Sequence, residues 1–206
     1  MKKIFFLLLS LMICVSFSFA QVSSSESFEQ VCKNISSHKI TKGNFNQIKV
    51  IKKLKREIKS SGTFIVSSKD GVLWNTQKPF KSSMAITKNG IVQTNAQGKK
   101  SVVAANGNAT FEQVSGLMTS LFNGNIDELN KNFEIEFIGS SENWNVNLVP
   151  KDASVQNFIT NIEMAGEMTI DTMVLNEPSG DFTKYEFSNQ TFAESLTSEE
   201  LAKFKE

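Results

Sequence analysis

The sequence predicts an α+β protein built on one curved antiparallel sheet of about ten strands, with amphipathic helices covering it. Two stretches, 45–95 and 133–189, consist of short runs of alternating or β-rich residues with turn residues between them. Two segments with helical spacing, 25–36 and 108–124, precede and separate these stretches. Strands joined by tight turns pair antiparallel, which places the chain in the α+β class.

The first twenty residues have the composition of a secretory signal. Two lysines at positions 2 and 3 precede the apolar run 4–15, which is too short to span a bilayer with ease. Small residues at Ser18 and Ala20 suit a cleavage site, so we expect cleavage after Ala20 and export of residues 21–206. The alternative, a lipoprotein signal cleaved before Cys14, is disfavoured because Ile13 stands where a small residue is needed.

Charge argues against a nucleic-acid partner. Without its first twenty residues the chain loses two of its 22 basic residues and keeps its 21 acidic ones, so its charge is close to neutral. Polyanion binding needs a clustered positive excess. The densest basic run, Lys49 to Lys59, is interpreted as a solvated strand edge, with a phosphate or lipid-headgroup patch as the alternative.

Few residues could bind a metal or take part in catalysis. His38 is the only histidine, and Cys32 is the only cysteine after residue 20, which excludes a Cys/His zinc site and an intramolecular disulfide. We expect His38 in an exposed loop, without a nucleophile and carboxylate beside it. The sequence therefore predicts no enzyme, no cofactor and no metal centre.

The first expected element is an amphipathic helix over 25–36. Phe28, Val31, Cys32 and Ile35 share one face of it, so Cys32 is expected to be a buried apolar residue rather than a reactive thiol. Five strands are expected next, at 45–52, 61–68, 71–77, 82–88 and 90–95. Hairpin turns are expected at Asp-Gly, 70–71, and Asn-Gly, 89–90, because these dipeptides accept the positive φ of tight turns.

A second, strongly amphipathic helix is expected over 108–124. Thr110 and Gln113 have the spacing of a capping box, and Asn123-Gly124 is a stop signal. Its apolar side either seals a dry core or opens for a ligand, and the spacing does not distinguish the two. This side carries Phe111, Val114, Leu117, Met118, Leu121 and Phe122.

One more short helix is expected just after residue 124, and strands then follow at 133–139, 144–150, 155–164, 167–175 and 181–189, before a polar helix or tail at 196–206. The strict alternation at 133–139 and 144–150 predicts one wet and one dry face. A sheet of about ten strands with an apolar face must curl or be covered. Helices of limited length cover it only in part, so the curved sheet would enclose an apolar cavity.

Several short motifs occur in order along the chain: Phe45-Asn46-Gln47, Ser60 to Phe64, Gly71 to Trp74, Lys78-Pro79-Phe80, Asn89-Gly90, Leu121 to Gly124, Trp144 to Lys151, and Gly180 to Phe187. In this order and spacing the sequence resembles the LolA-like outer-membrane lipoprotein carriers. The resemblance implies one carrier domain over 21–206, an open half-barrel of the LolA/LolB type with a helical lid. It also implies a monomeric periplasmic chaperone without covalent chemistry.

The resemblance further implies the partners. Acyl chains of lipoproteins, or other lipid, would lie in the cavity and pass from an inner-membrane lipoprotein-releasing transporter to an outer-membrane acceptor. The expected lining comprises Phe64, Val66, Val72, Trp74, Met84, Ile86, Phe111, Val114, Leu117, Met118, Leu121, Phe122, Phe137, Val146, Leu148, Ile162, Met168 and Ile170.

One feature of the family pattern is missing, which keeps two alternatives open. The family's latch arginine, which precedes a proline, has no counterpart, because Arg56 is the only arginine. The first alternative is a periplasmic lipid-binding or lipoprotein-sensing protein of the same fold that makes no hand-over. The second is an interaction module with a filled core.

Overall fold

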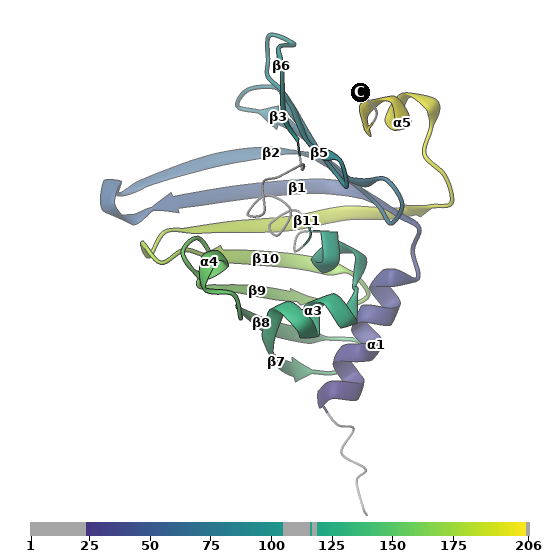
Figure 1. Cartoon of the computed structure of the whole chain (residues 1–206), viewed down its shortest axis with the longest axis vertical. Coiled ribbons are helices and arrows are strands. Elements are labelled where there is room, and N and C mark those ends of the chain that lie inside the picture. The colour runs from purple at the N-terminus through teal and green to yellow at the C-terminus, as the bar shows by residue number, and fades with distance from the viewer. Residues whose placement is uncertain (1–23, 105–115, 117–118, 205–206) are drawn as a thin grey trace, which may run out of the picture.

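The computed structural model describes residues 24–104, 116 and 119–204, and these contain one open sheet of 11 strands (Figure 1). The strand order is β6-β5-β4-β3-β2-β1-β11-β10-β9-β8-β7, and every neighbouring pair is antiparallel. The first strand, β1, pairs with the last strand, β11, in the middle of the sheet. The predicted α+β class and antiparallel sheet are confirmed. The expected signal, 1–20, lies outside the described residues.

The first half of the chain contains α1 (Ser24–Ser36), β1 (Ile40–Ile51), η1 (Lys52–Leu54), β2 (Arg56–Ser67), β3 (Gly71–Lys78), β4 (Ser82–Thr87), β5 (Gly90–Thr94) and β6 (Lys100–Ala104). The expected helix and five strands are confirmed, although β1 and β2 each begin five residues earlier than expected. The two hairpins are confirmed, but the glycines carry the positive φ, 113° at Gly71 and 151° at Gly90. The edge strand β6 was not predicted.

The second half contains α3 (Ile126–Asn132), β7 (Phe133–Gly139), β8 (Trp144–Pro150), α4 (Ala153–Gln156), β9 (Asn161–Gly166), β10 (Ile170–Asn176), β11 (Phe182–Ala193) and α5 (Ser198–Phe204). The strand expected over 155–164 is wrong in its first half. Asp152 accepts a hydrogen bond from the Ser154 backbone N–H and starts the single turn of α4, which buries Val155.

The second amphipathic helix is described only near its C-terminal end. Residues 119–123 are helical, and Gly124 follows with a φ of 59°, as a helix stop requires. The rest of the expected helix, including the capping box of Thr110 and Gln113, lies outside the described residues. Asn125 then caps α3, because its side chain accepts a hydrogen bond from the Glu128 backbone N–H.

The sheet is apolar on both faces in its central strands. We call the face that carries Phe45, Phe64 and Phe187 the inner face, and the opposite one the outer face. Alternation along β2 places Phe64 and Val66 in the inner core and Ile65 in the outer one. Continuous apolar runs such as 64–66 and 72–74 are typical of strands covered on both sides.

Different helices cover the two faces. The inner core includes Phe28, Val31 and Cys32 of α1, Leu129 of α3, and Leu121 and Phe122. Phe28 packs on Phe137 of β7 with ring centroids 5.6 Å apart. The smaller outer cluster gathers Ile40, Ile65, Leu73 and Ala85 under Phe204 of α5. The larger apolar core therefore lies on the inner face.

Candidate functional site

Aromatic rings from several strands meet on the inner face. The register pairs Phe64 with Trp74 and Phe45 with Phe187, so these rings share one face of neighbouring strands. Trp74 lies 4.2 Å from Phe45 and 5.4 Å from Tyr185 between ring centroids, and the latter contact is edge to face. Favourable aromatic pairs have centroids about 4.5 to 7 Å apart, so the contact with Tyr185 is typical and Phe45 packs more closely than that on Trp74.

Phe122 closes this cluster from the helical side. Its ring lies 5.8 Å from Phe187, 6.4 Å from Trp74 and 6.5 Å from Phe64 between centroids. It is buried, and it reaches the sheet because residues 119–123 continue as a helix up to Gly124. A Cβ at Gly124 would lie 2.5 Å from the backbone oxygen of Cys32, so this turn packs directly on α1.

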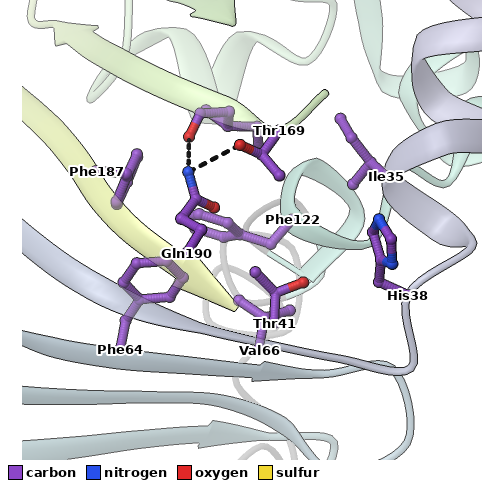
Figure 2. A pocket seen from close by; sticks show the side chains of 10 residues that line it. Ile35, His38, Thr41, Phe64, Val66, Phe122, Thr169, Phe187 and Gln190 are labelled. Atoms are coloured by element: carbon purple, nitrogen blue, oxygen red, sulfur yellow. Dashed lines mark hydrogen bonds between the residues drawn. The ribbon is translucent and has the colours of Figure 1, made fainter. Parts of the chain in front are cut away.

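A small hollow lies beside Phe122 next to the C-terminal end of α1 (Figure 2). Its volume of about 20 Å³ holds roughly one water molecule. Gln190 donates hydrogen bonds of 2.9 Å to Thr169 Oγ1 and to the Ile170 carbonyl, so its amide is satisfied without a ligand. The lining consists of Ile35, His38, Thr41, Phe64, Val66, Phe122, Thr169, Ile170, Phe187 and Gln190.

A larger hollow, of about 200 Å³, lies on the same face and also touches Phe122. Phe122 therefore lines both hollows. The centre of the larger hollow is apolar and aromatic, and its margin carries neutral amides and hydroxyls. Its lining comprises Gln47, Val72, Trp74, Thr76, Ser82, Ser83, Met84, Ile86, Gln93, Phe122, Met173 and Tyr185.

Two titratable side chains buried on this face, Tyr185 and Cys32, are neutral near pH 7. Burial raises the pKa of Tyr185 to about 12. Burial, and then the charge of Glu29, raise the pKa of the Cys32 thiol to about 12. Cys32 is buried as the helical pattern predicted. Among the described residues, no three His, Cys, Asp or Glu side chains are grouped to hold a metal ion.

Thirteen of the predicted lining residues lie in or against the inner core. Eight of them line the two hollows: Phe64, Val66, Val72, Trp74, Met84, Ile86, Phe122 and Ile170. The other five, Leu121, Phe137, Val146, Leu148 and Ile162, pack elsewhere in the same core. Four further predicted residues, Phe111, Val114, Leu117 and Met118, lie outside the described residues.

The structure places two predicted residues differently. Met168 is 67% exposed, because it lies in the turn between β9 and β10, where alternation no longer sets the side-chain direction. His38, expected in an exposed loop, is half-buried, and its ring stacks on Phe192 with centroids 3.4 Å apart. It lines the smaller hollow.

The prediction missed several residues of the inner face. Tyr185 and Phe187 alternate along β11, and Met173 lies opposite Tyr185 on β10. The alternation of aromatic and polar residues in 181–189 could have identified Tyr185 and Phe187 as residues of the dry face. Phe45 is predicted as part of a strand and of a family motif but not as a lining residue, and the structure places it in the inner core.

The chain matches one protein-family model and is similar to several solved structures of low sequence identity. A family model described as outer membrane lipoprotein carrier protein LolA matches residues 36–204. No curated protein matches at a significant level. Within the described part of the chain, no helix has the length and apolar character needed to cross a membrane.

Solved structures with a similar arrangement have low identity. A LolA superfamily protein from Nitrosomonas europaea is 9% identical, with 86% of this chain and 96% of that chain covered and a TM-score of 0.48. An outer membrane lipoprotein-sorting protein domain from Vibrio parahaemolyticus is 9% identical, with 88% of this chain and 98% of that chain covered and a TM-score of 0.46. LprF from Mycobacterium bovis is 13% identical, with 84% of this chain and 94% of that chain covered and a TM-score of 0.41.

Proposed function

The chain belongs to the LolA family of outer membrane lipoprotein carrier proteins, and on this premise we propose that it carries lipoproteins through the periplasm with their acyl chains held on the inner face. One observation supports the proposed carrier function most directly. The hollow of about 200 Å³ has an apolar centre of Val72, Trp74, Met84 and Ile86, and its titratable group, Tyr185, is neutral. The function is binding and release, without covalent chemistry.

The size of the hollow sets a limit on what it holds. At roughly 30 Å³ for a group the size of water or methylene, about 200 Å³ accepts six or seven methylenes. Their transfer from water contributes about 5 kcal/mol at 0.8 kcal/mol each. A full acyl chain needs more room, and a shift of Phe122, which lines both hollows, would enlarge the space on this face.

A second candidate is a periplasmic lipid-binding or lipoprotein-sensing protein that makes no hand-over to an acceptor. Arg56 favours it. The only arginine of the chain is exposed at the start of β2, and the inner-face aromatic cluster lies further along this strand. Arg56 therefore cannot serve as the latch arginine that the carriers of this family use.

Binding of a fluorescent acyl probe, with competition by a triacylated peptide, tests the proposal. We expect saturable probe binding that the peptide displaces. Met84→Gln should weaken binding about tenfold, because it adds a polar amide to the apolar centre of the hollow. The matched substitution Met168→Gln, at an exposed turn, should leave binding unchanged.

Two results would contradict the proposal. One is the absence of probe and peptide binding by a delipidated preparation. The other is an equal effect of the two methionine substitutions. Mass spectrometry of the protein purified from its native envelope identifies the cargo, and transfer of a bound lipoprotein to outer-membrane vesicles distinguishes a carrier from a protein that only binds lipid.

A further inference from the structure

The hairpin formed by β1 and β2 projects beyond the neighbouring strands. On one side β3 pairs with β2 only from Ser61 onward, and on the other side β11 pairs with β1 only up to Val50. Ile51 and Arg56 therefore pair with each other alone, and Glu57 to Ser60 of β2 have a neighbouring strand only on the β1 side. Figure 1 shows this tip extending past the rest of the sheet. The predicted solvated strand edge holds for Arg56 to Ser60 of β2, which have no partner on β3, whereas Lys49 and Val50 of β1 lie between β2 and β11.

This tip has an excess of positive charge. Residues 49–59 contain six basic side chains and one acidic side chain. Two of the basic residues have partners, because Lys49 Nζ lies 2.9 Å from Glu177 and Lys59 Nζ lies 3.6 Å from Glu57. The other four basic residues are exposed and form no ion pair with any described residue; they are Lys52, Lys53, Lys55 and Arg56.

Exposed apolar side chains lie among these cations. Leu54 is 58% exposed, and the 3₁₀ turn η1 that presents it buries none of its residues. Ile58 is 44% exposed. An apolar tip surrounded by lysines suits a lipid interface, where the leucine enters the acyl boundary and the cations reach the headgroups. A soluble acidic partner would pair with the cations but would give Leu54 no reason to be exposed.

We propose that the tip of the β1–β2 hairpin, residues 51–58, docks on the surface of an anionic lipid membrane. The four unpaired cations bind headgroup phosphates, and Leu54 inserts at the interface. Each cation near such a surface strengthens binding about fivefold. This docking site goes beyond the proposed carrier function, because it does not require an occupied inner face.

The direction of the hairpin gives the docking a structural consequence. Ile58 lies on the same face of β2 as Phe64, and Ile51 lies on the same face of β1 as Phe45, since alternate residues of a strand share a face. The inner side of the tip is therefore continuous with the inner face of the sheet. A docked hairpin would hold the inner face close to the bilayer surface.

Co-sedimentation with vesicles tests the docking site. Vesicles of phosphatidylcholine with about one third phosphatidylglycerol should bind the protein, and binding should weaken as salt increases. Replacing both Lys53 and Lys55 by Gln should reduce the partition coefficient about 25-fold, and Leu54→Asn about fivefold. The control replaces Lys69 and Lys88 by Gln; both are exposed in turns at the other end of the sheet, so binding should not change.

Several outcomes would overturn the proposal. They are absence of binding to the anionic vesicles, equal binding to pure phosphatidylcholine vesicles, and equal loss in the tip and control variants. Binding to heparin without binding to vesicles would assign the tip to a soluble acidic partner instead. Acyl-probe binding by the tip variants should stay unchanged, so failure of the docking site is distinguished from failure of the carrier function.

Discussion

Trp74 illustrates how much a single residue of the inner face could be predicted. Its strand, and the face that it shares with Val72 but not with Leu73, follow from the period of two, and the structure confirms both. Its neighbours could not be predicted in this way. Tyr185 lies more than a hundred positions along the chain, and only the pairing of β1 with β11 brings the two rings together. Strand periodicity gives a direction, whereas a contact needs the register.

Tyr185 provides a direct measurement of how dry the inner face is. It is the only tyrosine of the chain, so absorbance at 295 nm during an alkaline titration follows this group alone. We expect a midpoint near pH 12 in the folded protein, because burial raises its pKa to about 12 from 10.0. The Tyr185→Phe variant should lose the transition.

The same shift makes stability depend on pH in one direction. The raised folded pKa means that the unfolded chain loses the phenolic proton first, so this contribution is complete below pH 10 and is lost as the pH rises toward 12. Between these values the free energy of unfolding should fall less steeply with pH in Tyr185→Phe than in the wild-type protein. A midpoint near pH 10 in the folded protein would show that the ring is solvated.

At the scale of elements, the strands with clear alternation were predicted closely. The expected bounds 133–139 and 144–150 coincide with β7 and β8. The segment 155–164 was misassigned because its β-rich residues belong to two structures. Val155 is buried by a turn that Asp152 caps, and strand pairing begins only at Asn161. The extra length of β2 was missed because Arg56 to Lys59 lie in water on both faces, and polar residues there follow no period.

Gly62 controls the packing of β2 on β3 beneath the aromatic cluster. The register between these strands shifts between Ser61 and Gly62, and a Cβ at Gly62 would lie 1.9 Å from the Asn75 carbonyl oxygen and 3.0 Å from the Phe45 ring. We expect Gly62→Ala to lower the free energy of unfolding by at least about 2 kcal/mol, because backbone must move to relieve the clash. Urea denaturation measures this loss.

A second glycine offers the matched control. A Cβ at Gly116, which is helical and exposed, would meet nothing within 4 Å. Gly116→Ala should therefore be neutral or stabilise the protein by up to about 1 kcal/mol, since alanine favours a helix. Equal denaturation midpoints for the two variants would show that β2 and β3 are not in the close contact described.

At the scale of the whole molecule, the fold separates stability from binding. Interior strands such as β2 and β3 bury residues on both faces, and α5 fixes the outer face through Phe204. The inner face keeps a hollow of about 200 Å³ beside Phe122. The sequence predicted that helices would cover an apolar sheet incompletely. The size of the hollow could not be predicted, because it depends on how side chains from distant strands fill the space.

Occupation of the inner face should therefore stabilise the whole protein. At a concentration of triacylated peptide one hundred times its Kd, binding to the folded state adds about 2.7 kcal/mol. For a chain of this length that raises the Tm by roughly 5 to 10 °C. Met84→Gln should show a smaller increase at the same peptide concentration, and Met168→Gln the full increase, in thermal unfolding followed by circular dichroism. If both variants show the full increase, the peptide binds away from the hollow that Met84 lines.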